Sequence, residues 1–178
     1  MLNEPTLQKL TAMRLAGMAK AWQEQQDDPQ YAGLGFDERF GLIVDAEGFH
    51  RENRGMRRRL REARLRIGQA CLEDLRGADQ RGLDRALIRQ FATCQRVAAH
   101  KRVLITGATG KGKTYVAFAL PQQACRKGHW TLYRRIPHLL DELTLARADG
   151  TCAGLMNRFA QTDLMVLDDL GLVTLNDK

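Results

Sequence analysis

The fold of this chain is decided by one stretch, Gly107-Ala108-Thr109-Gly110-Lys111-Gly112-Lys113-Thr114. It fits the pattern G-x-x-x-x-G-K-[ST], which is typical of a phosphate-binding loop. Glycines let the backbone N–H groups close around an oxyanion, which a Cβ atom would obstruct. Lys113 can reach the β- and γ-phosphates of a nucleotide, and the hydroxyl of Thr114 can ligate Mg²⁺. A glycine-rich turn with an unrelated lysine is the alternative interpretation.

The residues on either side of the loop favour nucleotide binding over a simple turn. Val103-Leu104-Ile105 predicts a short buried strand before the loop, and residues 116–120 predict a helix after it. The N-terminus of that helix would add further N–H donors and the positive end of a dipole. We therefore expect the loop residues, together with Tyr115, to bind a nucleotide, and we count Lys113 among the catalytic residues.

A second motif, Asp163-Leu164-Met165-Val166-Leu167-Asp168-Asp169, predicts a strand that ends in two carboxylates. An apolar strand that ends in Asp is typical of the Walker B motif, and ligands bind at the carboxyl ends of parallel strands. We expect Asp168 to hold Mg²⁺ opposite Thr114, directly or through water. Asp169 would accept a hydrogen bond from the attacking water, as a general base or an orienting group. The start of a turn is the alternative for this Asp-Asp pair.

The region between the two motifs predicts one further strand, Trp130-Thr131-Leu132-Tyr133, followed by a helix from Pro137 through Arg147. Gly128 is placed to end the helix that follows the loop, as a C-cap residue does. Pro121 lies in the interior of that helix, where the missing N–H and a clash with the preceding turn cost about 3 kcal/mol.

The N-terminal part of the chain predicts helices. Apolar residues recur at helical spacing through residues 1–30, and Gly17 is expected to break that segment into two helices. A long helix is expected to start at an N-cap on Asp37 and to run to about Leu65. Its apolar residues Phe40, Ile43, Val44 and Phe49 are expected to face inward.

Residues 51–66 contain eight arginines and two glutamates, so this segment alone carries a net charge of +6. On a helix, Arg54, Arg58 and Arg61 share one face, and Arg57, Arg61 and Arg64 share an adjoining one. Arginines spaced in this way can meet successive phosphates of a nucleic acid. The expected DNA-contacting residues are Arg51, Arg54, Arg57, Arg58, Arg61 and Arg64. A solvated helix face is the alternative, and no aromatic residue in the segment supports base stacking.

Composition limits the class of protein. The chain has 178 residues, 44% of them hydrophobic, and a net charge of +7, which points to a polyanionic partner. The four cysteines, at positions 71, 94, 125 and 152, form no C-x-x-C pair, so buried free thiols are expected. The sequence shows no signal peptide and no apolar stretch of 18 residues. We therefore expect a cytoplasmic protein.

Several stretches together resemble the IstB-like helper ATPases of insertion sequences, from about residue 5 to residue 175. The stretches are Glu38-Arg39-Phe40-Gly41-Leu42-Ile43-Val44-Asp45, Ala70-Cys71-Leu72-Glu73-Asp74, Arg81-Gly82-Leu83-Asp84-Arg85-Ala86-Leu87, Leu104-Ile105-Thr106-Gly107, Leu145-Ala146-Arg147-Ala148-Asp149-Gly150 and Leu167-Asp168-Asp169-Leu170-Gly171-Leu172. These ATPases are similar to bacterial helicase loaders.

The resemblance implies an α/β fold with the parallel sheet of an AAA+ P-loop NTPase, preceded by an α-helical domain. We expect a helical DNA-binding and assembly domain over residues 1–78 and an ATP-binding domain over residues 79–178. The resemblance further implies ATP and Mg²⁺ as cofactors, and the protein would form a homo-oligomer on DNA and assist a partner transposase. Carried over by position, residues 107–114 bind ATP, Asp168 binds Mg²⁺ and Asp169 serves the water.

The sequence departs from the family after its second motif, because only nine residues follow Asp169. Family members continue through two more strands, which carry a polar sensor residue and arginines that act in a neighbouring subunit. The family's sheet has the order 5-1-4-3-2, so strands 1–3 alone predict an incomplete sheet and impaired hydrolysis. A helicase-loader-like replication protein and a remnant that binds but does not hydrolyse ATP are the alternative functions.

Overall fold

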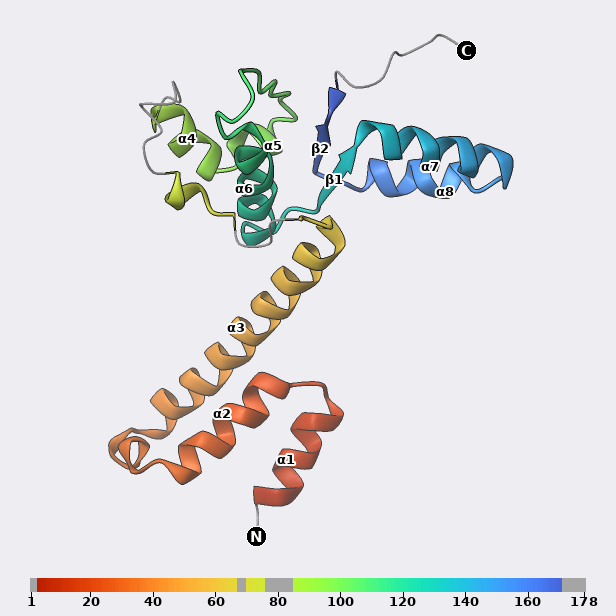
Figure 1. Ribbon diagram of the computed structural model, residues 1–178. Coiled ribbons are helices and arrows are strands. Elements are labelled where there is room, and N and C mark those ends of the chain that lie inside the picture. Colours follow the sequence, from red (N-terminus) through yellow and green to blue (C-terminus); the bar gives the residue numbers. More distant parts are fainter. Residues whose placement is uncertain (1–2, 67–69, 76–84, 171–178) are drawn as a thin grey trace. The chain divides into compact units, whose positions relative to one another are not determined.

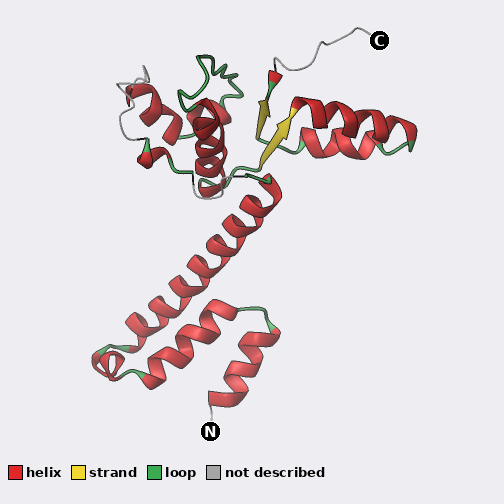
Figure 2. Ribbon diagram, viewed as in Figure 1, coloured by secondary structure: helices red, strands yellow, loops and turns green. Residues whose placement is uncertain are grey.

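The computed structural model of the protein describes residues 3–66, 70–75 and 85–170 (Figure 1). Figure 2 shows that these residues are mostly helical, with one pair of short strands. The chain divides into two compact units, Met1–Arg57 and Arg58–Lys178, here called the first and second units. The expected domain boundary at residue 78 lies outside the described residues and stays a prediction.

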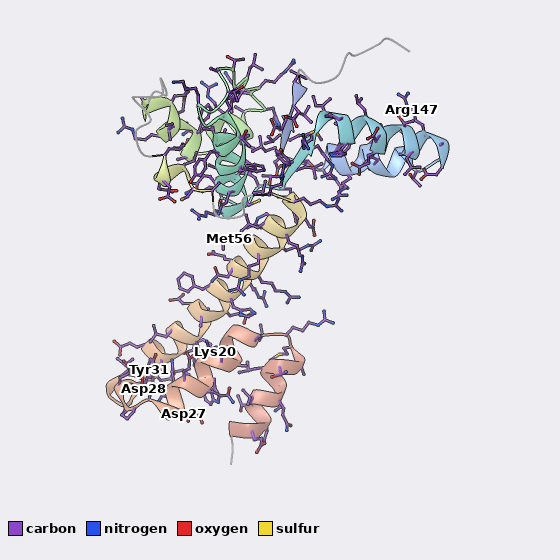
Figure 3. All side chains as sticks on the ribbon, viewed as in Figure 1. Lys20, Asp27, Asp28, Tyr31, Met56 and Arg147 are labelled. Atoms are coloured by element: carbon purple, nitrogen blue, oxygen red, sulfur yellow. The ribbon has the colours of Figure 1, made fainter. Side chains whose placement is uncertain are left out.

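The described part of the first unit consists of three helices and a short 3-10 turn. They are α1 (Asn3–Ala12), α2 (Ala16–Asp27), η1 (Pro29–Gly33) and most of α3 (Phe36–Ala63). Asp28 accepts a hydrogen bond from the Gln30 N–H at 2.9 Å and so caps η1, beside Tyr31 (Figure 3). The long helix expected to follow this turn is confirmed, and it is 28 residues long.

The start of α3 differs from the expected N-cap on Asp37, which lies inside the helix. Gly35 occupies the capping position, since its carbonyl accepts a hydrogen bond from the Arg39 N–H at 3.1 Å. The Glu38 carboxylate reaches back to accept a hydrogen bond from the Gly35 N–H at 3.0 Å. A Glu three residues after the cap satisfies an otherwise unpaired donor in this way, which is half of a capping box.

Gly17 does not break the N-terminal helices, contrary to the expectation. The chain turns three residues earlier, where Arg14 adopts a φ of +61°, and Gly17 lies buried inside α2. A Cβ atom on Gly17 would lie 2.6 Å from the Ala46 carbonyl oxygen and 2.7 Å from Glu47 Cα. The glycine therefore allows the backbones of α2 and α3 to come into direct contact.

Glu47 makes use of this close approach. Its Oε2 accepts hydrogen bonds from the backbone N–H groups of Gly17, at 2.8 Å, and Met18, at 3.2 Å. These are donors of the first turn of α2, which has no side-chain cap of its own. Arg51 donates to Glu47 Oε1 at 2.7 Å, and this hydrogen bond lowers the pKa of the buried Glu47 carboxyl despite its burial. A residue of α3 thus caps α2.

The apolar residues expected to face inward from α3 are mostly exposed. Ile43 is buried, whereas Phe40 is 50% exposed, Val44 is 46% exposed and Phe49 is 66% exposed. The prediction was wrong for these three. In the described first unit, α3 buries only a narrow stripe against α2, which includes Glu47. Val44 and Phe49 lie about a third of a turn from Ile43 and so fall outside the stripe. Phe40 lies on the same face as Glu47 but is not covered by a described helix.

The second unit surrounds a small parallel sheet. Besides the end of α3, its elements are η2 (Leu72–Asp74), α4 (Arg85–Ala92), α5 (Gln95–Ala98), α6 (Lys113–Arg126), β1 (Thr131–Arg135), α7 (Ile136–Ala148), α8 (Cys152–Ala160) and β2 (Leu164–Asp168). Strands β1 and β2 pair in parallel, from Thr131 opposite Leu164 to Arg135 opposite Asp168. These elements confirm the predicted helix after the loop, both later strands and the helix at Pro137. They are the arrangement expected for part of a P-loop NTPase domain behind a helical region.

The strand predicted at residues 103–105 is not formed. Residues 101–112 contain no helix or strand, and Val103 and Leu104 are 44% and 79% exposed. A strand needs a neighbouring backbone to pair with. Among the described residues, no backbone segment pairs with residues 103–105. The two strands that are described, β1 and β2, pair with each other.

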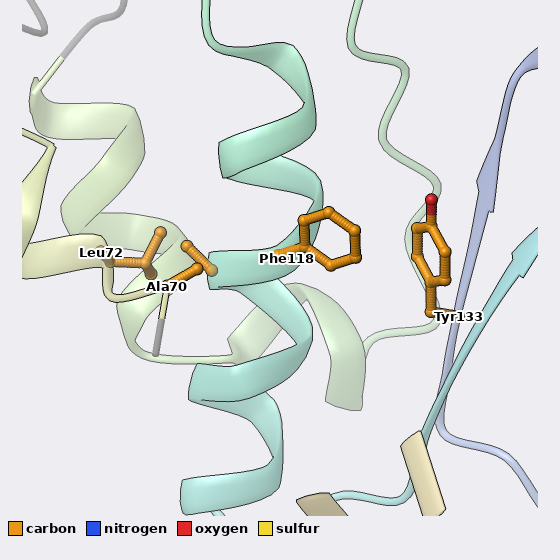
Figure 4. Packing of buried hydrophobic residues seen from close by; sticks show 5 residues of the cluster. Ala70, Leu72, Phe118 and Tyr133 are labelled. Atoms are coloured by element: carbon orange, nitrogen blue, oxygen red, sulfur yellow. The ribbon is translucent and has the colours of Figure 1, made fainter. Parts of the chain in front are cut away.

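The core of the second unit forms around α6, which packs against both strands. Phe118 of α6 and Tyr133 of β1 contact each other with ring centroids 4.7 Å apart, and Ala119, Ala70 and Leu72 complete the buried cluster (Figure 4). The segment of residues 70–75 therefore belongs to this unit. Burying aromatic and aliphatic side chains of this size contributes about 1.5–3 kcal/mol each to its stability.

Helix α6 accommodates Pro121 and ends as predicted. Pro121 is fully buried and the helix continues past it to Arg126. Gly128 adopts a φ of +96°, and the N–H groups of Gly128 and His129 donate to the carbonyls of Cys125 and Ala124. These bonds form the glycine C-cap that the sequence predicts. Arg59 of α3 donates from Nε to the same Cys125 carbonyl at 2.9 Å.

The cysteines are free, as expected, but only half of them are buried. Cys94 and Cys125 lie in the interior, where burial raises the pKa of both thiols, whereas Cys71 and Cys152 are partly exposed. In the described part of the chain, no helix has the length and apolar content needed to cross a bilayer.

The close approach at Gly17 generates a stability prediction. Replacing Gly17 by Ala should destabilise the protein by about 1–3 kcal/mol, because the new Cβ collides with the backbone of α3. Gly41→Ala on α3 is the matched control, since a Cβ there meets nothing within 4 Å and should stabilise the helix by about 0.5–1 kcal/mol. Urea unfolding followed by circular dichroism measures both changes. Equal effects of the two substitutions would contradict the close approach.

Candidate nucleotide site and arginine helix

The loop of residues 107–112 leads directly into α6, which begins at Lys113. Gly107, Gly110 and Gly112 have φ values of +147°, +80° and +88°. Residues with a side chain rarely adopt these φ values, so the backbone conformation itself requires glycine at these three positions. A Cβ on Gly107 would meet only the Lys113 side chain, at 4.0 Å, so crowding is not the reason for that glycine.

Lys113 lies across the inside of this loop. Its Nζ donates hydrogen bonds to the carbonyl oxygens of Gly107, at 2.6 Å, and Ala108, at 2.9 Å. The ammonium group is therefore already held at the loop, next to the N-terminus of a helix 14 residues long. Both the positive charge and the helix dipole favour an anion at this position.

Backbone donors are available at the start of α6. Val116 is the first residue of the helix whose N–H reaches a carbonyl, that of Gly112 at 3.1 Å. The N–H groups of Lys113, Thr114 and Tyr115 have no acceptor among the described residues, as is usual for a first helical turn. The Thr114 side chain is exposed. This end of α6 thus offers N–H groups, a hydroxyl and an ammonium group together.

The Tyr115 side chain stabilises the fold of the second unit. Its hydroxyl accepts a hydrogen bond from the Cys71 N–H at 3.1 Å and donates to the Cys71 carbonyl at 3.3 Å. These bonds fasten the segment of residues 70–75 to α6. Because the hydroxyl is bonded to Cys71, Tyr115 could bind a nucleotide only through its backbone N–H.

The two carboxylates follow the second strand, as expected. Asp168 is the last residue of β2, and its Oδ2 accepts a hydrogen bond from the Tyr133 hydroxyl at 2.7 Å. Its Oδ1 accepts one from the Asp169 N–H at 2.9 Å. Asp169 has a φ of +61° and its carboxylate pairs with the Arg135 guanidinium. The end of the sheet therefore holds two acids, one phenol and one guanidinium.

This cluster has electrostatic consequences. Burial raises the pKa of the Tyr133 phenol, and the hydrogen bond to the Asp168 carboxylate raises it further. The hydrogen bond to Asp169 likewise raises the pKa of Arg135. Each proton is held more tightly because its loss would leave a carboxylate without a donor.

The loop and the carboxylates are carried by elements that pack together. Helix α6 contacts both β1 and β2, and its N-terminal end points the same way as the C-terminal end of β2 (Figures 1 and 4). In the described part of the chain, no hydrogen bond or ion pair joins the loop to Asp168 or Asp169. The structure thus places both motifs on one packed core without direct contact between them.

Sequence reasoning missed Tyr133 and Arg135. Both lie on β1, two residues apart and so on one face of the strand. Arg135 stands opposite Asp168 in the sheet register. The sequence could have indicated them as follows. If the two predicted strands are aligned in parallel by their last residues, the end of the first strand lies beside Asp168.

The six arginines expected to contact DNA differ in their surroundings. Arg51 pairs with Glu47, and Arg58 pairs with Glu62 at 3.0 Å. Arg54, Arg57, Arg61 and Arg64 are exposed and have no partner within the described residues. Arg64 follows the end of α3 and has a φ of +55°, so it does not continue the helical face predicted for it.

Comparison with known proteins places the sequence in a family. Residues 8–178 match the family described as IstB-like ATP binding protein. "Insertion sequence IS1162 putative ATP-binding protein" of Pseudomonas fluorescens is 41% identical over 177 residues, which are 99% of this chain and 77% of that protein. "Putative insertion sequence ATP-binding protein y4pL" of Sinorhizobium fredii is 41% identical over 178 residues, 100% of this chain and 72% of that protein.

A more distant relative is "Insertion sequence IS21 putative ATP-binding protein" of Pseudomonas aeruginosa. It is 29% identical over 143 residues, 80% of this chain and 54% of that protein.

The burial of Tyr133 and its hydrogen bond to Asp168 predict that this phenol loses its proton at unusually high pH. Of the three tyrosines, one should ionise well above the ordinary value of 10.0, because the folded protein favours its neutral form. Tyr133 thus contributes stability that is complete below that ordinary pKa and is lost as pH rises through the raised one. Tyrosinate absorbance during alkaline titration should lose its last step in Tyr133→Phe and keep it in Tyr115→Phe. A step above the ordinary value that survives in Tyr133→Phe would contradict the assignment of the raised pKa to Tyr133.

Proposed function

The chain belongs to the family of IstB-like ATP-binding proteins of insertion sequences, and from this we propose that ATP binds with its phosphates at the loop of residues 107–114. The observation that carries the proposal is the position of Lys113, whose Nζ lies on the carbonyls of Gly107 and Ala108. In the complex this ammonium group would turn to the β- and γ-phosphates. The free N–H groups of the first turn of α6, Tyr115 included, would donate to the same anion.

The donor set also fits Mg²⁺, which takes oxygen ligands. Thr114 offers an exposed hydroxyl and Asp168 a carboxylate, and these two residues would hold the ion, which supplies a counter-charge for the phosphates when bound. Tyr133 fixes the Asp168 carboxylate through the 2.7 Å hydrogen bond. Asp169 would orient the attacking water, for which its carboxylate has to leave the ion pair with Arg135.

We further propose that the arginines of α3 contact DNA phosphates. Support comes from the unpaired guanidinium groups of Arg54, Arg57 and Arg61, which lie three to four residues apart on a continuous helix. Arg51 and Arg58 each form an ion pair with a glutamate and would therefore contribute less to DNA binding. On this proposal the protein forms a homo-oligomer with ATP on DNA and assists the transposase of its insertion sequence, as the family resemblance implies.

ATP binding should depend on Lys113. Lys113→Ala should weaken ATP binding roughly 10- to 100-fold, because it removes a charge-assisted hydrogen bond to phosphate. The matched control is Lys111→Ala, which removes an exposed charge from the same loop and should change affinity about twofold at most. Calorimetry with Mg²⁺-ATP measures both. Equal affinity of Lys113→Ala and the unaltered protein would refute the site.

DNA binding should depend on salt through the helix arginines. Replacing Arg54, Arg57 and Arg61 by Gln should reduce the slope of log affinity against log salt by about 0.9 for each phosphate that the helix no longer neutralises. The control replaces Arg14, Arg89 and Arg147, which are exposed arginines outside this helix. Anisotropy of a labelled duplex gives the slopes. A control triple that lowers the slope as much would show that general charge, not this helix, binds DNA.

A further inference from the structure

A cavity of about 260 Å³ lies in the second unit, away from the carboxylates. Its wall is formed by the last turns of α3, the start of β1 and the end of α8 and includes Arg58, Glu62, Trp130, Arg158, Gln161 and Thr162. Trp130 directly precedes β1, whereas Asp168 and Asp169 lie at the opposite end of the parallel strands. The cavity is therefore separate from the candidate nucleotide site.

An aromatic ring and a guanidinium group stack in this wall. Arg58 lies over the Trp130 ring, 5.2 Å from its centroid. The backbone around the ring is fixed, because the Trp130 N–H donates to Asp163 Oδ2 at 2.7 Å and the Trp130 carbonyl accepts from the N–H groups of Asp163 and Leu164. The arginine-rich segment contains no aromatic residue, so the fold supplies one from a strand far along the chain.

Two further lining residues have side chains without partners among the described residues. The Arg158 guanidinium and the Gln161 side-chain amide are exposed and make no hydrogen bond or ion pair within the described part of the chain. Arg58 is matched by Glu62, at 3.0 Å, so the cavity keeps one uncompensated positive charge, that of Arg158. Arg61, one turn after Arg58 on α3, is exposed and does not line the cavity.

We propose that this cavity binds an unpaired nucleotide of a DNA strand, with its base against Trp130 and its phosphate on Arg158. The proposal rests on the DNA binding proposed above and adds to it a preference for single-stranded or locally unpaired DNA. An indole ring in a wall that also carries a guanidinium group without a partner among the described residues, that of Arg158, is the combination that single-strand binders use, because every base has a face that can stack.

The test compares three labelled ligands of equal length at one salt concentration: oligothymidylate, the same backbone without bases, and a duplex. The unaltered protein should bind oligothymidylate roughly 5- to 100-fold more tightly than the abasic strand, the range expected for base stacking on one ring. Trp130→Leu should lose this discrimination, and Trp130→Tyr should keep most of it. Thermal melting of each variant establishes that it is folded.

The charge is tested separately. Arg158→Gln should weaken binding of both single strands at least threefold and of the duplex less than twofold. Arg147→Gln is the matched control, since Arg147 is exposed on the neighbouring helix α7 and does not line the cavity (Figure 3). Free thymidine monophosphate that competes as well as the strand would overturn the assignment to DNA.

Two further outcomes separate this inference from the proposed function. No binding of any DNA by the unaltered protein would overturn both. Duplex binding that depends on Arg54, Arg57 and Arg61, together with equal affinity for the thymidylate and abasic strands, would overturn the cavity and leave the arginine helix standing.

Discussion

Phe118 and Tyr133 touch with ring centroids 4.7 Å apart, and this contact joins the helix that carries the candidate phosphate loop to the strand that lies beside the candidate carboxylates. Phe118 belongs to the helix that starts at the phosphate loop, and Tyr133 belongs to β1 and holds Asp168 through its hydroxyl. The loop has no strand before it and no contact with the carboxylates in the described part of the chain. Its position relative to Asp168 therefore depends on how α6 packs against β1.

Local patterns predicted much of this structure. The helix after the glycine–lysine loop and the apolar strand ending at Asp168 were confirmed, because apolar periodicity depends on neighbours in the sequence. The glycines of the loop have positive φ values. The predictions that were wrong depended on distant partners. Val103-Leu104-Ile105 has strand-forming residues but no neighbouring strand among the described residues, and Phe40 has the spacing of a core residue but no described helix to cover it. Gly17 was predicted to break the helix, but it lies inside α2, where the Ala46 carbonyl beside it leaves no room for a Cβ atom.

The candidate site shows the same division. Lys113, Thr114, Asp168 and Asp169 could be chosen from motifs, whereas Tyr133 and Arg135 required the strand register. Charge counting grouped the arginines of residues 51–66 as one surface. The structure instead divides them by use: Arg59 holds a carbonyl of α6, Arg58 covers Trp130, and Arg54, Arg57 and Arg61 keep guanidinium groups without a partner in the described part of the chain. No periodicity in the sequence distinguishes these three uses.

The hydrogen bond from Arg59 to the Cys125 carbonyl gives α6 a second role. Helix α6 has 14 residues and so is about 21 Å long at 1.5 Å per residue. The glycine–lysine loop is at one end of this helix, and the last turns of α3 are hydrogen-bonded to the other end. A single helix therefore both carries the loop at its start and anchors the last turns of α3 at its end.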